Sequence, residues 1–213
     1  MSDRPFGARE LYEGSRFLAP LSEEALLEAG RAADLHEGAT LLAVGAGNGC
    51  AAIFLAEAFH AYARCVEEDP ELLELAREHG ERSPARRRLR FTGSAAGEAG
   101  PFDCVASLCA PRPAPVPAAA GRLLLGRFDV PPALAGLFPA PAAAAGRIAW
   151  RRDASPLEWE RFLVPLERAL RRYRDRLRPG DPVALLALHV DRQISAFRAH
   201  ATDVRYELVV VAP

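Results

Sequence analysis

The sequence contains no lysine, so all 27 of its basic residues are arginine, and 28 acidic residues balance them. The net charge of −1 and the isoelectric point of about 6.5 give no electrostatic reason to expect binding to nucleic acid or to an anionic membrane surface. The one local basic run, at residues 85–90, is typical of an exposed link between a helix and a strand. The charge pattern therefore favours a small-molecule partner.

Cysteine pairs and long apolar runs are also missing. The cysteines at positions 50, 65, 104 and 109 form no CxxC pair and lie in or beside apolar segments, which argues against a zinc site and favours buried free thiols. No run approaches the roughly 20 apolar residues that cross a bilayer. No charged and then apolar leader opens the chain. These absences predict a cytoplasmic protein with no metal and no membrane partner.

Hydrophobic periodicity predicts an α/β fold. Apolar runs predict strands at 40–44, 61–66, 89–92, 102–108, 121–128, 147–152 and 205–211, and helical patterns lie at 9–18, 22–33, 51–59 and 70–79. From residue 156 apolar side chains recur at three- and four-residue steps, which predicts a long helix that ends at Pro179-Gly180. A second helix, capped by Asp181, runs from there towards His200. Two helices are thus inserted before the last strand.

A glycine-rich turn follows the first strand. Gly45, Gly47 and Gly49 let the backbone approach a ligand closely and aim helix N-terminal N–H groups at it. Glu67 ends the next strand, 18 residues after Gly49, about the separation at which an acid accepts both hydroxyls of a ribose. Together they indicate a nucleoside ligand. A turn that only joins strand to helix, with an exposed acid after it, is the simpler alternative.

Two kinds of nucleoside ligand suit such a turn. A nicotinamide or flavin dinucleotide prefers a further glycine where this chain has Cys50, and a nicotinamide-dependent oxidoreductase also needs a proton-relay residue that we do not find. S-adenosylmethionine, the other candidate, has no pyrophosphate to hold.

The motifs resemble those of class I S-adenosylmethionine-dependent methyltransferases. The first motif of that family is similar to LLAVGAGNG at 41–49, and the second to VEEDPELLELAR at 66–77. The third, fourth and fifth strands of the family are similar to RFTGSAA at 90–96, PFDCVASL at 101–108 and GRLLLG at 121–126. The tail resembles a subgroup of small methyltransferases in which a tryptophan-bearing helix pair precedes the final strand.

The resemblance covers most of the chain and implies its architecture. We expect a Rossmann-like α/β fold with a seven-stranded, mostly parallel sheet, helices on both faces and an antiparallel last strand. The helical insertion would lie between the last two strands. Residues 1–213 would form a single methyltransferase-like domain, with N-terminal helices in 1–38, the cofactor-binding core in 39–128 and the insertion in 156–200.

The resemblance also implies a function and a set of site residues. The expected function is methyl transfer from S-adenosylmethionine to a small-molecule acceptor. Tyr12 would fold over the cofactor, Trp159 would wall the acceptor pocket and His189 is the candidate base, although ordinary packing or surface roles explain all three as well. The cofactor's methionine end would rest on Gly45, Ala46, Gly47 and Gly49, its ribose on Glu67, and its adenine near Glu68, Ser94 and Ala95, with Ser107 beside the sulfonium.

The chain departs from the family pattern at three places. Ala43 and Ser94 stand where the family usually carries acids that contact the cofactor's amino groups. Losing two charge-assisted hydrogen bonds of about 1.5 to 3 kcal/mol each would weaken affinity by roughly two to four powers of ten. Alternating prolines at 111–117 would shorten or remove the helix between the fourth and fifth strands. The alternative function is therefore a catalytically inactive binding or partner subunit, for which a homodimer is one arrangement.

Overall fold

The computed structural model describes residues 7–95, 100–108, 120–138, 146–174 and 182–213. The strands are β1 (Thr40–Val44), β2 (Tyr62–Val66), β3 (Leu89–Thr92), β4 (Phe102–Ser107), β5 (Ala120–Asp129), β6 (Arg147–Asp153) and β7 (Arg205–Ala212). The helices are α1 (Ala8–Tyr12), α2 (Glu23–Ala32), α3 (Cys50–Ala58), α4 (Pro70–Arg82), α5 (Pro156–Tyr173) and α6 (Pro182–Ala199), with 3₁₀ turns at Arg86–Arg88 and Pro132–Leu134.

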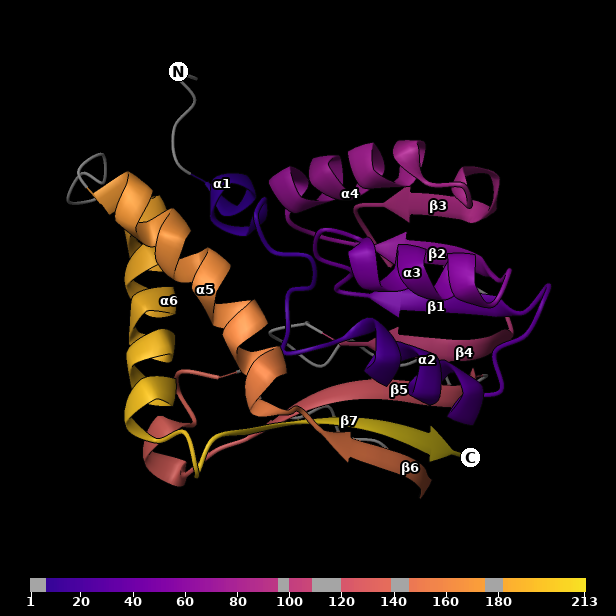
Figure 1. Cartoon of the computed structure of the whole chain (residues 1–213). Coiled ribbons are helices and arrows are strands. Elements are labelled where there is room, and N and C mark those ends of the chain that lie inside the picture. Colours follow the sequence, from indigo (N-terminus) through magenta and orange to yellow (C-terminus); the bar gives the residue numbers. More distant parts are fainter. Residues whose placement is uncertain (1–6, 96–99, 109–119, 139–145, 175–181) are drawn as a thin grey trace.

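The seven strands form one sheet in the order β3-β2-β1-β4-β5-β7-β6 (Figure 1). β1 to β5 pair in parallel, and β7 pairs antiparallel with both β5 and β6, so β7 alone runs against the others. In sequence, α5 and α6 lie between β6 and β7. The predicted mostly parallel sheet, the antiparallel last strand and the inserted helix pair are confirmed.

The core lies against both faces of the sheet. Leu41 and Ala43 of β1 belong to the large cluster that includes the apolar faces of α2 and α3, whereas Leu42 and Val44 belong to a smaller cluster on the other face. This alternation is what a pleated strand requires. Figure 1 shows α2 and α3 in front of the sheet, and α1, α5 and α6 beyond the carboxyl ends of β1, β2 and β3. The carboxyl ends of these strands therefore face helices from both ends of the chain.

The helix N-termini follow their sequence signals. Ser22 caps α2 by accepting a hydrogen bond from the Ala25 N–H at 3.1 Å, and Asp69 caps α4, whose first residue is Pro70. Ser155 and Glu158 form a capping box at the start of α5.

The first helix is shorter than predicted. It covers Ala8–Tyr12, whereas the periodicity predicted a helix over 9–18. The reason is a tertiary contact, because the Asn48 side chain donates hydrogen bonds to the backbone carbonyls of Ser15 and Arg16, and this holds the segment 13–21 in a non-helical path. The predictions for the Pro179-Gly180 stop, the Asp181 cap, Cys109 and the region between β4 and β5 lie outside the described residues.

The described cysteines behave as structural thiols. Cys65 and Cys104 are buried and free, and burial raises the pKa of both to about 12, whereas the half-buried Cys50 reaches about 11. Among the described residues, we find no group of three or more His, Cys, Asp or Glu that would hold a metal ion. No helix in the described ranges is long and apolar enough to cross a membrane.

Candidate functional site

The glycine turn lies at the carboxyl end of β1. Gly45, Gly47 and Gly49 have φ angles of 61°, 60° and 77°, a left-handed backbone that side chains disfavour. The Ala46 N–H donates to the carbonyl of Val66 at 2.9 Å, and the Gly49 N–H donates to the carbonyl of Ala46 at 3.0 Å. The turn is therefore shaped by its own hydrogen bonds and tied to the end of β2.

Glu67 lies against this turn. Its carboxylate accepts hydrogen bonds from the Gly47 N–H at 2.6 Å and from the Asp69 N–H at 2.9 Å, and the residue is 9% exposed. Burial raises its pKa, although the two backbone hydrogen bonds work in the opposite direction. A carboxylate has about four acceptor positions, so about two are left for a ligand.

Adjacent strand ends bring the other predicted cofactor residues to the same edge. β3, β2, β1 and β4 are neighbours in the sheet, and all four run in the same direction. Ser107 is buried at the end of β4, next to the turn, whereas Glu68 after β2 and Ser94 and Ala95 after β3 are exposed. The parallel topology thus places the predicted methionine, ribose and adenine contacts along one row.

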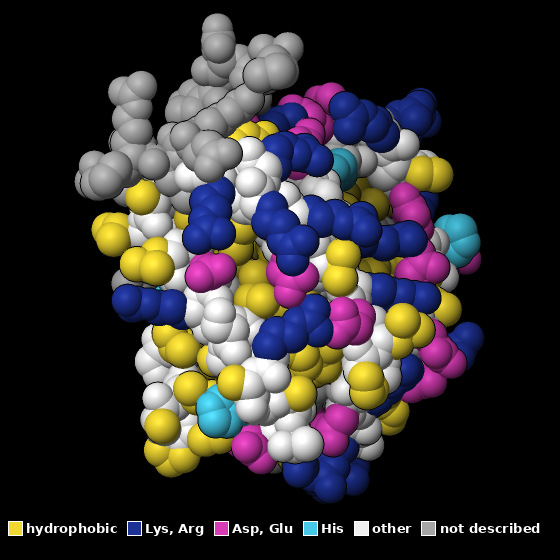
Figure 2. All heavy atoms as spheres, turned by 60° about the vertical axis from the view of Figure 1, so that its left-hand side comes forward, with side chains coloured by type: hydrophobic (Ala, Val, Ile, Leu, Met, Phe, Trp, Pro, Cys, Tyr) yellow, Lys and Arg dark blue, Asp and Glu magenta, His cyan; other side chains and the backbone are white. Residues whose placement is uncertain are grey.

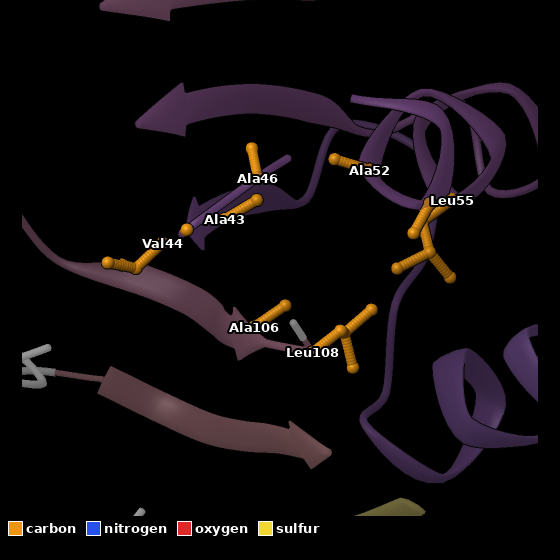
Figure 3. A pocket seen from close by; sticks show the side chains of 9 residues that line it. Ala43, Val44, Ala46, Ala52, Leu55, Ala106 and Leu108 are labelled. Carbon is orange, nitrogen blue, oxygen red and sulfur yellow. The ribbon is translucent and has the colours of Figure 1, made fainter. Parts of the chain in front are cut away.

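A small apolar cavity adjoins the turn (Figure 3). Its volume is about 20 Å³, enough for about one water molecule and far less than S-adenosylmethionine requires. Ala43 lies on its wall, so the position where the resemblance leads us to expect an acid carries a methyl group instead. The lining residues are Ala43, Val44, Gly45, Ala46, Ala51, Ala52, Leu55, Ala106 and Leu108.

The segment 13–21 covers the turn. Asn48 Nδ2 donates to the carbonyls of Ser15 at 2.7 Å and Arg16 at 3.3 Å, and Asn48 is itself buried. A methyl group added at Gly47 would lie 2.5 Å from Leu18 Cδ1, so Leu18 packs directly on the turn. The sequence did not predict these contacts of Asn48 and Leu18, because a contact between the turn and a segment some 30 residues earlier has no local sequence signal.

Ser15 has a buried hydroxyl beside this turn. The residue is 3% exposed, and its Oγ has no hydrogen-bond partner in the part of the chain that the structure describes. Buried polar atoms nearly always have a partner, so an orphaned hydroxyl marks a position that a ligand or water can satisfy.

A second and larger cavity, of about 320 Å³, lies beside the segment 13–21. It is bounded by that segment, by the first turn of α2 and by α5. The lining residues are Arg16, Phe17, Ala19, Leu21, Ser22, Glu23, Glu24, Arg161 and Phe162.

The residues proposed for the acceptor side lie apart from both cavities. Trp159 is 5% exposed and stacks on Phe197 with a ring separation of 4.1 Å, so it is a core residue and lines neither cavity. Phe162, one helical turn later, does line the larger cavity. His189 is exposed on α6, and Tyr12 is half-buried at the end of α1; neither lines the two cavities.

Comparison with known proteins gives matches only in structure. No family model matches the sequence, and no curated protein matches it significantly.

A SAM-dependent methyltransferase from Thiobacillus denitrificans, in complex with S-adenosyl-L-homocysteine, superimposes with a TM-score of 0.74 and 19% identity over 100% of both chains. The equivalent complex from Geobacter sulfurreducens gives 0.73 and 18% over 100% of both chains. The cyclopropane synthase MmaA2 from Mycobacterium tuberculosis gives 0.61 and 13%, again over 100% of both chains. Because that enzyme is named for a ring-forming reaction, the fold by itself does not fix the chemistry. What these similarities do establish is that the chain has the fold of the class I S-adenosylmethionine-dependent methyltransferases.

Proposed function

We propose that the protein binds S-adenosylmethionine along the carboxyl ends of β3, β2, β1 and β4 and transfers its methyl group to a small molecule. The observation that carries this proposal is the Glu67 carboxylate, held 2.6 Å from the Gly47 N–H with acceptor positions to spare. Two structures of the same fold, from Thiobacillus denitrificans and Geobacter sulfurreducens, contain S-adenosyl-L-homocysteine, and this supports the choice of ligand.

The residues at this edge fit the cofactor's chemistry. Glu67 would accept the ribose hydroxyls, and the glycines at 45, 47 and 49 would allow the methionine end to approach the backbone. The orphaned Ser15 hydroxyl would supply a further hydrogen bond from the segment 13–21. The cavity at the turn holds only about 20 Å³, and Leu18 packs on Gly47, so our proposal includes a shift of Leu18 and its segment away from Gly47 when the cofactor binds.

The cofactor, when bound, supplies a methyl carbon activated by a positive sulfonium. The chain has to align the acceptor with that carbon and keep water out. Leu108, next to Ser107 at the end of β4, is fixed because the Tyr206 hydroxyl donates a hydrogen bond to its carbonyl at 2.9 Å. Once the cofactor is bound, Leu18 would close over it again and exclude water from the side of the turn. His189 lines neither cavity, so we assign it no proton transfer.

A second candidate function is a non-catalytic binding or partner subunit with the same fold. The apolar wall at Ala43 favours it, because the cavity offers no carboxylate to a cationic amino group. In this case the turn and Glu67 would stabilise the fold alone, and an interaction with a second chain would be the function.

Calorimetric titration with S-adenosylmethionine separates the two candidates. We expect saturable binding, and we expect Glu67→Gln to weaken it about tenfold or more through the lost charge-assisted hydrogen bonds. The matched control is Glu81→Gln, which removes an exposed acid from α4. No heat and no rise in melting temperature at millimolar ligand would refute methyl transfer and leave the partner-subunit candidate.

We further propose that residues 1–213 act as one domain in the cytoplasm. The free thiols of Cys65 and Cys104 are compatible with a reducing compartment. Sedimentation of the purified chain would decide between a monomer and a homodimer, and a single cooperative unfolding transition would support one domain.

A further inference from the structure

The larger cavity has the size and floor of a small-molecule site. Its volume of about 320 Å³ lies at the lower end of the range of about 300 to 1,000 Å³ that such sites occupy. Phe17, which is 6% exposed, and Leu21, 5% exposed, form part of an apolar floor, and Phe162 closes it from α5. A molecule with one ring-sized apolar body fits this space.

Two pairs of opposite charges line the same cavity, and three of the four charged groups have partners. Arg16 forms an ion pair with Glu23 and lies over the Phe17 ring at 5.5 Å, and Glu24 lies 3.7 Å from Arg152. Within the described ranges, Arg161 has no ion-pair partner. Its guanidinium is therefore the one charge of the cavity wall, as far as the structure describes it, that is left for a ligand.

The surface around α5 does not supply a broad field of one sign. Figure 2 shows arginine and acidic side chains interspersed with apolar ones over the face that it presents. Selection by charge at this cavity therefore depends on individual contacts of Arg161 and not on a general positive potential.

The segment 13–21 contacts both this cavity and the glycine turn. Phe17 packs edge-on against Phe54 of α3 with a ring separation of 6.4 Å and faces the larger cavity. The next residue, Leu18, packs on Gly47. A ligand bound in the larger cavity would therefore contact the same segment that covers the proposed cofactor site.

We infer that the larger cavity is the acceptor site and that it takes a small organic anion. Its ring-sized apolar body would rest on Phe17 and Phe162, and its carboxylate or phosphate would bind the guanidinium of Arg161, whose forked donors match either group. This inference rests on the proposed function, because methyl transfer requires the acceptor to reach the methyl carbon, and this happens only when the segment 13–21 shifts as proposed for cofactor binding. A cationic molecule would repel Arg161, and a neutral one would gain nothing from it.

Probes that share a benzene ring and differ in charge test this inference. We would measure the binding of benzoate, methyl benzoate and benzylammonium to the whole chain by calorimetry at low salt, in the absence of S-adenosylmethionine. Benzoate should bind more tightly than the other two, and phenyl phosphate then tells whether a carboxylate or a phosphate is preferred. Equal or tighter binding of methyl benzoate or benzylammonium, or no binding of either anion, would overturn the inference.

A pair of arginine variants on one helix ties that binding to the cavity. Arg161→Gln should weaken benzoate binding about tenfold, the loss of one partly exposed charge-assisted contact. Arg168→Gln is the matched control, because Arg168 is also exposed on α5, lies seven residues further along and does not line the cavity. An unchanged Kd in Arg161→Gln, or an equal loss in both variants at unchanged melting temperature, would overturn the assignment.

The same preparations titrated with S-adenosylmethionine test the proposed function separately. If benzoate binds and S-adenosylmethionine does not, methyl transfer is refuted and the anion site stands as a binding site only. If S-adenosylmethionine binds and neither anion does, the anion site alone is refuted. Arg161→Gln should leave the affinity for S-adenosylmethionine unchanged.

Discussion

The hydroxyl of Ser22 donates a hydrogen bond to the carboxylate of Glu158, a residue 136 positions later in the chain. Ser22 also caps α2, and Glu158 accepts a hydrogen bond from the Ser155 N–H at 2.7 Å within the capping box of α5. Glu158 is 3% exposed. One bond thus locks the first turns of two helices together at the edge of the larger cavity.

We predict that Glu158→Gln destabilises the fold in a pH-dependent way. Burial alone raises the pKa of Glu158, but the hydrogen bonds from Ser22 and Ser155 lower it below its ordinary value overall. A lowered folded-state pKa means that the stabilisation is present above the unfolded-state pKa and is lost as the pH falls through the folded-state pKa. At pH about 7 the loss should be about 1 to 3 kcal/mol.

Urea denaturation at neutral and at acidic pH checks this prediction. The difference in unfolding free energy between the wild type and Glu158→Gln should become smaller in acid. Glu81→Gln, at an exposed position, should differ little from the wild type at either pH. A gap that stays constant with pH would mean that the charge of Glu158 is not what stabilises the contact.

The second prediction concerns the contact between Gly47 and Leu18. Gly47→Ala places a methyl group on a left-handed backbone and 2.5 Å from Leu18 Cδ1. Gly38→Ala carries the same kind of backbone penalty, at a φ of 83°, but has no atom within 4 Å. The strained backbone should lower the free energy of unfolding of both variants by about 1 to 2 kcal/mol. Gly47→Ala should be less stable than Gly38→Ala, because its methyl group also collides with Leu18.

Thermal unfolding of a double-mutant cycle of Gly47→Ala and Leu18→Ala measures the additional loss of stability that the Leu18 contact causes. If Leu18 causes it, Gly47→Ala made in a Leu18→Ala background should cost about as much as Gly38→Ala. Additive losses in the cycle would show that Leu18 does not press on the turn.

Tyr206→Phe tests how the end of β4 is held. Removing the hydroxyl leaves the Leu108 carbonyl without the hydrogen bond that it accepts at 2.9 Å, in a buried position. We expect a loss of about 1 to 3 kcal/mol in unfolding free energy, together with weaker binding of S-adenosylmethionine. Tyr62→Phe, at a side chain that is 53% exposed, is the control and should change neither quantity. A stability loss with unchanged cofactor affinity would remove Leu108 from the site.

The raised pKa of Glu67 predicts how cofactor binding depends on pH. Burial is the main cause of that rise, so the carboxylate takes up its proton at a higher pH than an ordinary glutamate does. The protonated group accepts fewer hydrogen bonds. As the pH is lowered, the affinity for S-adenosylmethionine should therefore begin to fall at a pH above the ordinary glutamate pKa of about 4.3. Calorimetry over a pH series, with Glu67→Gln as the reference, checks this. A parallel fall in the variant would assign the effect to another group.

Local sequence patterns were enough to predict most helices and strands of the fold. The apolar runs, the cap at Ser22 and the proline at the start of α4 act within a few residues, and they predicted the strands and helices almost to their ends. The early end of α1 was not predictable, because it depends on hydrogen bonds from Asn48. The order of the strands in the sheet was not predicted, because a strand's own sequence does not specify its neighbours, and the antiparallel last strand was expected only from the family resemblance.

The candidate site also has parts that the local sequence predicted and parts that it did not. The glycine turn and Glu67 are adjacent to their strands, so their meeting followed from two neighbouring parallel strands. On α5 the periodicity predicted an apolar face but could not tell which of its aromatic side chains reaches the core. Trp159 does, and Phe162 lines the larger cavity instead.

The packing of Leu18 on Gly47 also leads to a prediction of how fast a ligand binds. If the segment 13–21 has to lift before S-adenosylmethionine enters, association has two steps, and its observed rate in a stopped-flow experiment should level off at high ligand concentration. Leu18→Ala should remove the plateau and shorten the residence time of the bound ligand. A rate that rises linearly in the wild type would show that the segment does not control entry. If the wild type shows the plateau and Leu18→Ala removes it, one leucine side chain that takes no part in the chemistry sets the rates at which the ligand enters and leaves.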